Sequence, residues 1–214
     1  MSLYPLALKI GGRRCVVVGG GAVAERKVAS LLECGADVLL VAPDATDQIR
    51  AWAALGRIKF IERHFEPSDV AGALIAIAAT DEPQVNLAVA DAARASGALV
   101  NVVDVPDLCE FYVPASVTRG DLQITISTGG SSPALAKRLR IDLERQFGPE
   151  YEAYLKLLAR LRSELKARVP DRARRNEAEE RFLASPALRL IAEGRLRDAE
   201  QIMADCLRLA GEKA

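Results

Sequence analysis

Apolar runs alternate with segments of helical spacing along the first half of the chain. The run RCVVVGG, which begins at Arg14, is continuous, as expected of a strand buried on both faces. In the segment AVAERKVASLLECGA that follows, apolar residues have helical spacing, and Gly35 is placed to end the helix. Further strands are predicted in DVLLVAP, IKFIER, GALIAIAATD and ALVNVVD, and further helices in DATDQIRAWAALG and EPQVNLAVADAARASG. This alternation predicts an α/β domain with a doubly wound parallel sheet over residues 1–113.

A different pattern follows over residues 114–147. Two strand-like runs flank the turn signal Arg119-Gly120-Asp121, which predicts a β-hairpin. An amphipathic helix comes next, with Ser131 or Ser132 as its N-cap and Pro133 as its first residue. A lone hairpin and helix cannot bury both of their faces. We therefore expect this α+β region to pack on the first domain or on a second copy of the chain.

The remaining residues, 148–214, show helical patterns and no strand pattern, so we expect them to form a helical domain. Breaks are expected at Gly148-Pro149, Pro170, Ser185-Pro186 and Gly194. Between Lys156 and Arg175 basic residues far outnumber acidic ones. This stretch is either a solvated helix face or a basic surface for a polyanionic small molecule.

Composition and charge narrow the classes of function. The 29 basic residues balance 29 acidic ones, which argues against nucleic-acid binding through bulk charge. No apolar run approaches the roughly 20 residues of a membrane span, and the N-terminus lacks the pattern of a signal peptide. We therefore expect a cytoplasmic protein that binds neither nucleic acid nor a membrane.

The cysteines and the single histidine offer little catalytic chemistry. Cys15, Cys34, Cys109 and Cys206 are scattered, with no CxxC pair, and are interpreted as buried small hydrophobes in a reducing compartment. His64 has no His or Cys cluster around it, so no preformed metal site is expected, and we interpret it as a partly buried loop histidine.

A glycine-rich turn joins the first strand to the first helix. Residues 19–24, GGGAVA, fit the GxGxxG/A pattern in its proper context, between a strand and a helix. Glycine N–H groups and the helix N-terminus there suit a dinucleotide pyrophosphate, as in a Rossmann-like fold. Asp44, after the second strand, is the nearby carboxylate for the ribose, and the turn holds no arginine, which favours NAD over NADP. The alternative is a glycine turn needed only for packing.

Polar residues follow the later strands at the edge where ligands bind. Asp104 ends the fifth strand and either moves a proton or caps a loop. Thr80 and Asp81 end the fourth strand, and Asp81 is expected to cap the next helix. The loop STGGSSP, residues 127–133, precedes Lys137, Arg138 and Arg140; it either binds carboxylate or phosphate groups or is an ordinary helix start.

Several ordered motifs resemble one family. GGGAVAERK, AATDEPQVN, NVVDVP and FYVPASVTRGDLQITISTGGSSP together resemble the precorrin-2 dehydrogenase/sirohydrochlorin ferrochelatase family, which includes the N-terminal half of siroheme synthase. The resemblance implies NAD-dependent oxidation of precorrin-2 to sirohydrochlorin, and in some members insertion of ferrous iron. It implies a homodimer of a Rossmann domain, a central dimerisation region and a helical domain. The methyltransferase domain of the fused enzymes is not matched, so we expect precorrin-2 from another enzyme.

The resemblance also assigns roles to residues. It makes Asp104 the catalytic residue, which could also contact a metal transiently. It assigns cofactor binding to Ala22, Val23, Pro43 and Asp44, and the glycine pattern and the end of the fourth strand add Gly19, Gly20, Gly21 and Thr80. Those expected to bind the carboxylate-rich tetrapyrrole are Ser127, Thr128, Gly129, Gly130, Ser131, Lys137 and Arg138.

Two other classes of function share the same glycine motif. A dinucleotide-sensing regulatory domain would bind the cofactor without turnover and would not need Asp104. A dehydrogenase for a different small substrate is the second alternative, because fold alone does not define function.

Overall fold

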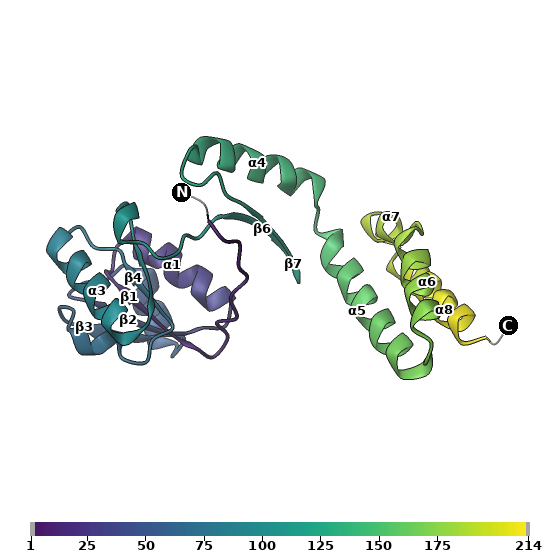
Figure 1. The fold of residues 1–214 in the computed structure, drawn as a ribbon, viewed down its shortest axis with the longest axis horizontal. Coiled ribbons are helices and arrows are strands. Elements are labelled where there is room, and N and C mark those ends of the chain that lie inside the picture. Colours follow the sequence, from purple (N-terminus) through teal and green to yellow (C-terminus); the bar gives the residue numbers. More distant parts are fainter. Residues whose placement is uncertain (1–2, 213–214) are drawn as a thin grey trace. The chain divides into compact units, whose positions relative to one another are not determined.

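The computed structural model describes residues 3–212, which form two compact units (Figure 1). The first unit is Tyr4–Val113, and the second begins at Pro114. The further division of the second unit at residue 147 stays a prediction.

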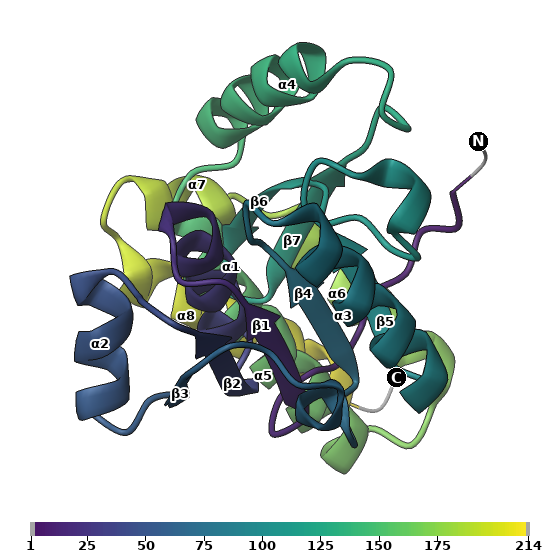
Figure 2. The same ribbon diagram turned by 90° about the vertical axis from the view of Figure 1, so that its left-hand side faces the viewer.

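The first unit contains the predicted parallel sheet. Its five strands run in the order β3-β2-β1-β4-β5, and the order can be followed in Figure 2. All four neighbouring pairs are parallel. The strands are β1 (Arg14–Val18), β2 (Asp37–Ala42), β3 (Lys59–Glu62), β4 (Ile75–Ala78) and β5 (Leu99–Val102). The doubly wound fold is thereby confirmed.

Helices cover both faces of this sheet. The helices are α1 (Ala22–Glu33), α2 (Asp47–Ala54) and α3 (Pro83–Ser96), with short 3-10 turns η1 (Pro67–Val70) and η2 (Pro106–Leu108). Successive residues of β1 point to opposite faces, so Val17 packs with α1 and α2 while Val16 packs with α3. The continuous apolar run of β1 therefore fills two separate cores.

The hairpin and the helix after it open the second unit. The strands β6 (Ala115–Arg119) and β7 (Leu122–Ile126) are antiparallel, and α4 spans Pro133–Gln146. Ser132 caps α4, because its hydroxyl accepts a hydrogen bond from the Leu135 N–H at 3.2 Å, as one of the two predicted caps. No residue of α4 is buried, and Leu135 and Leu139 keep 48% and 40% of their surface exposed. This helix thus leaves an apolar stripe uncovered.

The rest of the second unit is helical, as predicted. The helices are α5 (Glu150–Arg168), α6 (Arg172–Leu183), α7 (Ala187–Ala192) and α8 (Leu196–Gly211). Their core contains a stacked pair, Tyr154 and Phe182, with ring centroids 5.5 Å apart. Within residues 3–212 no helix is long and apolar enough to cross a bilayer.

Two basic residues of the stretch, both on α5, pair closely with acidic neighbours. Lys156 binds Glu152 at 2.6 Å, and Arg168 binds Glu164 at 2.8 Å, each one helical turn away. At these two residues the contacts agree with the interpretation of a solvated helix face.

The cysteines differ from the expectation in one respect. Cys15 and Cys206 are buried, and burial raises the pKa of the Cys15 thiol to about 11. Cys34, however, is exposed, and Cys109 is half-buried. The interpretation of all four as buried was therefore wrong, because Cys34 lies past the end of α1 and its side chain does not enter the core.

Candidate functional site

A cleft of about 360 Å³ opens at the carboxyl ends of the strands in the first unit. It is lined by the end of β1 and the residues after it (18–23), by the end of β2 and the residues after it (41–44), by 79–82 and 85 after β4, and by His64 and Phe65 after β3. Ligands of open α/β sheets bind at this edge. All eight residues predicted to hold the cofactor line this cleft.

The three glycines of the first turn serve different purposes. Gly19 has a φ of 118°, and a side chain there would collide with the Ala79 carbonyl. A side chain at Gly20 would collide with the Asp44 carbonyl. At Gly21, in contrast, φ is −80°, and a Cβ atom added there would have no neighbour within 4 Å. The protein's own packing thus explains the first two glycines but not the third.

The space beside Gly21 is suited to an anion. Gly21 is the N-cap of α1, and no side chain accepts a hydrogen bond from the first turn of this helix. Ala22 and Val23, the first residues of α1, line the cleft. The free N–H groups and the positive end of the helix dipole favour a pyrophosphate at this position. These residues therefore fit a dinucleotide.

An arginine reaches the turn after β2, although the turn itself has none. The guanidinium of Arg50, on α2, donates hydrogen bonds to Asp44 at 2.7 Å and to Glu62 at 3.0 Å. The hydrogen bond from Arg50 and that from the Ala45 N–H hold the pKa of Asp44 below its usual value. Asp44 is thus an ionised acceptor, as a ribose-binding carboxylate must be. The argument for NAD from a turn without arginine missed this contact.

Thr46 connects the turns after β1 and β2. Its N–H donates to the Gly20 carbonyl at 3.0 Å, and its hydroxyl donates to the Glu25 carboxylate at 2.6 Å. The same hydroxyl caps α2 by accepting from the Ile49 N–H. The glycine turn and the Asp44 turn are consequently held together.

Thr80 is held by a buried amide that the sequence interpretation missed. The Asn86 side chain, on α3, accepts from the Thr80 hydroxyl at 2.8 Å and donates to the Thr80 carbonyl at 2.9 Å. The expected cap at Asp81 was wrong: the N-cap of α3 is Glu82, whose N–H donates to the Thr80 hydroxyl. A polar residue among the apolar positions of α3 was the signal for Asn86.

His64 also differs from the expectation. It is exposed and lines the cleft, rather than being a partly buried loop residue. The sequence allowed this position in the cleft to be predicted, because His64 follows β3, and the carboxyl end of β3 lies at the same edge of the sheet as those of β1 and β2.

Asp104 lies in a turn after β5. It is exposed, and it is the one non-glycine residue with a positive φ, 61°, among residues 3–212. It is not among the residues that line the cleft. Burial and Arg26 lower the pKa of Lys27 on α1, while Cys109 and Asp104 act against this shift. Lys27 is therefore within electrostatic reach of Asp104. No cluster of three His, Cys, Asp or Glu side chains suited to a metal occurs in the described part of the chain.

The predicted substrate residues lie together in the second unit. The Ser127 hydroxyl accepts from the Gly129 N–H at 3.2 Å, and the Thr128 hydroxyl accepts from the Ser132 N–H at 3.1 Å. Gly129 and Gly130 both have positive φ, and the Ser131 N–H donates to the Thr128 carbonyl. On α4, Lys137 and Arg138 are exposed, whereas Arg140 pairs with Glu144. The loop is thus ordered by its own hydroxyl groups.

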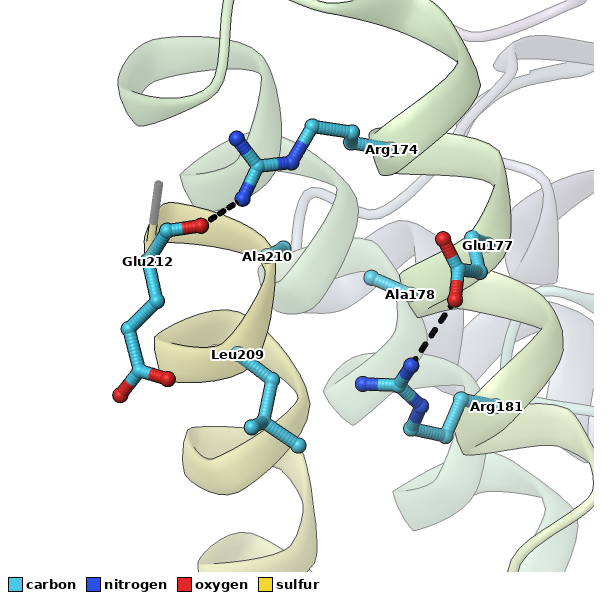
Figure 3. Close-up of a pocket in the computed structure, with 7 residues that line it drawn as sticks. All are labelled: Arg174, Glu177, Ala178, Arg181, Leu209, Ala210 and Glu212. Carbon is cyan, nitrogen blue, oxygen red and sulfur yellow. Dashed lines mark hydrogen bonds and ion pairs between the residues drawn. The ribbon is translucent and has the colours of Figure 1, made fainter. Parts of the chain in front are cut away.

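A second cleft, of about 350 Å³, lies between α6 and α8 (Figure 3). Arg181 pairs with the Glu177 carboxylate at 3.0 Å, whereas Arg174 donates one hydrogen bond to the Glu212 carbonyl. The charge of Arg181 is therefore already paired within this cleft.

Comparison with known proteins identifies relatives of the whole described fold. A family model described as "Putative NAD(P)-binding" matches residues 6–115. "Sirohaem biosynthesis protein central" matches residues 119–146, and "Sirohaem synthase dimerisation region" matches residues 151–207.

Individual proteins give the same result. Siroheme synthase of Methylococcus capsulatus is 39% identical over 100% of this chain, and that of Nitrosococcus oceani is 40% identical over 94%. This chain spans 45% and 43% of their lengths, so it is similar to less than half of each. The solved structure of SirC, a precorrin-2 dehydrogenase, is 27% identical, with a TM-score of 0.78 over 95% of this chain and 100% of SirC.

Proposed function

This chain belongs to the siroheme-biosynthesis family in which an NAD(P)-binding domain precedes the central and dimerisation regions, and we propose that it oxidises precorrin-2 to sirohydrochlorin. The observation that carries the proposal is the cleft beside Gly21, where the protein leaves open a space that its own packing does not require. The similarity to SirC, the precorrin-2 dehydrogenase, supports the choice of substrate.

NAD, when bound, supplies the acceptor for the hydride that leaves the tetrapyrrole. In this proposal the N-terminal N–H groups of α1 bind its pyrophosphate, and Asp44 accepts hydrogen bonds from its ribose. Asp104 takes the proton that leaves the substrate in the same oxidation, so the two electrons and the proton are both accounted for. The remaining residues orient the two reactants and exclude water.

The substrate is a polycarboxylate, so the protein must offer donors and positive charge. The loop of residues 127–131 contributes hydroxyl and N–H groups, and Lys137 and Arg138 contribute exposed cations in the first half of α4. We assign these residues to the propionate and acetate groups of the tetrapyrrole.

The active form in this proposal is a homodimer. The stripe of Leu135 and Leu139 on α4 is uncovered, and a hairpin with one helix cannot bury both of its faces. A second copy of the chain supplies the missing cover, in addition to contacts of residues 151–207, which match the family's dimerisation region. A cytoplasmic location, and insertion of ferrous iron into the product, remain predictions.

The deciding experiment is an absorbance scan under anaerobic conditions. The protein is mixed with precorrin-2 and NAD, and the spectrum is followed together with NADH formation. The proposal expects the sirohydrochlorin chromophore and NADH to appear in equal amounts. Tight NAD binding without either signal would instead indicate the dinucleotide sensor, and a parallel sample with NADP measures the preference between cofactors.

A further inference from the structure

The strand β5 is at the edge of the sheet, so its outward backbone groups need other partners. Those of Val100 pair with Glu110: the Val100 N–H donates to the carboxylate at 3.1 Å, and the Val100 carbonyl accepts from the Glu110 N–H at 2.9 Å. The returning segment therefore closes the edge of β5 at this point.

At Val102 the partner is a thiol. The Val102 N–H donates to Cys109 Sγ at 3.2 Å, and the Cys109 thiol lies 3.1 Å from the Val102 carbonyl. A thiol has one proton and can also accept, so a single side chain satisfies both backbone groups. Sγ also lies 3.4 Å from the Val105 carbonyl. Cys109 thus contacts the backbone on both sides of residues 103 and 104.

Asp104 lies between Val102 and Val105, the two residues that Cys109 contacts, and has the left-handed φ of 61°. A non-glycine residue keeps such a conformation only where its surroundings enforce it. The Val105 N–H bond to the Val102 carbonyl, at 3.3 Å, closes the turn; the Cys109 thiol binds both backbone groups of Val102 and can share its one proton with the Val105 carbonyl. The thiol therefore helps to fix the backbone turn that positions the Asp104 carboxylate.

We propose that Cys109 is a positioning residue for Asp104: its thiol holds the turn after β5 and so places the carboxylate that receives the substrate proton. This inference rests on the proposed function of Asp104. The cysteine acts through the backbone and takes no part in the chemistry.

The test compares Cys109→Ala, Cys109→Ser and the control Cys34→Ala in the full chain. Cys34→Ala makes the same substitution at an exposed thiol beyond the end of α1. We expect Cys109→Ala to lower kcat for precorrin-2 oxidation about tenfold, because small misplacements of reacting groups are costly. The Kd for NAD should stay within about twofold, since the glycine cleft is unchanged, and Cys109→Ser should restore part of kcat because a hydroxyl also donates and accepts. A merely structural role would lower the amount of folded protein without changing kcat per folded molecule.

Amide hydrogen exchange gives a second measurement that does not depend on activity. Exchange at Val102 and Val105 should be faster in Cys109→Ala than in Cys34→Ala. The positioning role would be overturned if amide exchange in Cys109→Ala were unchanged. It would also be overturned if Cys109→Ala kept the wild-type kcat while Asp104→Asn abolished activity. If the wild-type protein has no activity but amide exchange at Val102 and Val105 is faster in Cys109→Ala, the contacts of Cys109 are confirmed and the proposed function fails. If Cys109→Ala does not fold, the same two measurements on Cys109→Ser decide.

Discussion

The guanidinium of Arg63 donates two hydrogen bonds, of 2.8 and 2.7 Å, to the buried carboxylate of Asp69. The pair spans the loop between β3 and η1, and Asp69 also accepts from the Glu66 N–H at 2.8 Å. His64 and Phe65, which line the cofactor cleft, lie within this loop. One ion pair therefore stabilises the fold and holds one wall of the cleft.

Asp69→Asn should lower the free energy of unfolding by about 2 kcal/mol, because it removes the charge from hydrogen bonds in a buried place. The hydrogen bonds from Arg63 hold the pKa of Asp69 below its ordinary value of 3.8. The contribution is therefore fully present above pH 3.8 and is lost as the pH falls through the lower folded-state value. Urea unfolding at pH 7 and at a series of lower pH values measures the free energy of unfolding of both proteins. The difference between wild type and Asp69→Asn should shrink as the pH falls.

The control for this prediction is Asp91→Asn. Asp91 is an exposed carboxylate whose contact with Arg94 is 3.8 Å long, so its loss should be nearly neutral. Equal effects of the two substitutions would show that the buried pair has no special role.

Gly21→Asp should abolish NAD binding and leave the protein as stable as before. Its φ of −80° and ψ of −178° suit an N-cap, and aspartate is a favourable N-cap residue, so the fold accepts it. The added carboxylate, however, would lie against the pyrophosphate. Calorimetric titration with NAD measures the loss, and thermal unfolding checks the fold.

Two variants separate charge from space at the same turn. Gly21→Asn adds a similar volume without charge and should bind NAD more tightly than Gly21→Asp. Gly20→Ala should lower stability instead, because its methyl group would meet the Asp44 carbonyl. Unchanged NAD affinity in Gly21→Asp would refute the assignment of this turn.

The pattern of apolar and polar residues predicted the strands and helices, but it did not predict the side-chain contacts between them. The apolar runs and the strand–glycine–helix context identified β1, α1 and the cofactor turn, because buried parallel strands have a simple signature. Arg50, which reaches Asp44 from α2, and Asn86, which reaches Thr80 from α3, were not predicted. The spacing along α3 marks Asn86 as a buried polar residue, but the partner that each of these side chains reaches depends on how the elements pack, which local spacing does not encode. The same holds for Cys109, whose partners are backbone groups of an edge strand.

Leu135→Glu combined with Leu139→Glu should convert a dimer into a monomer. Each leucine is about half exposed in a single chain, so covering the rest of one in an interface contributes about half of the roughly 1.5–3 kcal/mol for burying a whole leucine side chain. Light scattering at micromolar concentration measures the mass. Arg145→Ser, on another side of α4, should leave the mass unchanged, and a monomeric wild type would rule the prediction out.

Asp104→Asn should remove sirohydrochlorin formation and keep NAD binding. Asparagine tolerates a positive φ, so the turn should remain folded, while the amide cannot accept the proton. Loss of a general base typically lowers the rate by about 10²–10⁴-fold. The rate of NADH formation measures the effect, and an NAD titration of the same variant is its control. A variant with the wild-type rate would exclude Asp104 as the base.

Iron insertion is tested separately, with sirohydrochlorin and cobalt or ferrous iron in the absence of NAD. Metal insertion requires a base for two pyrrole protons, and Asp104 could serve if the product occupies the same place as the substrate. We then expect the wild-type protein to accelerate insertion and Asp104→Asn to lose that acceleration. Insertion no faster than in a protein-free control would remove the chelatase activity and leave the dehydrogenase in place. Insertion that survives Asp104→Asn would show that the two reactions do not share a base.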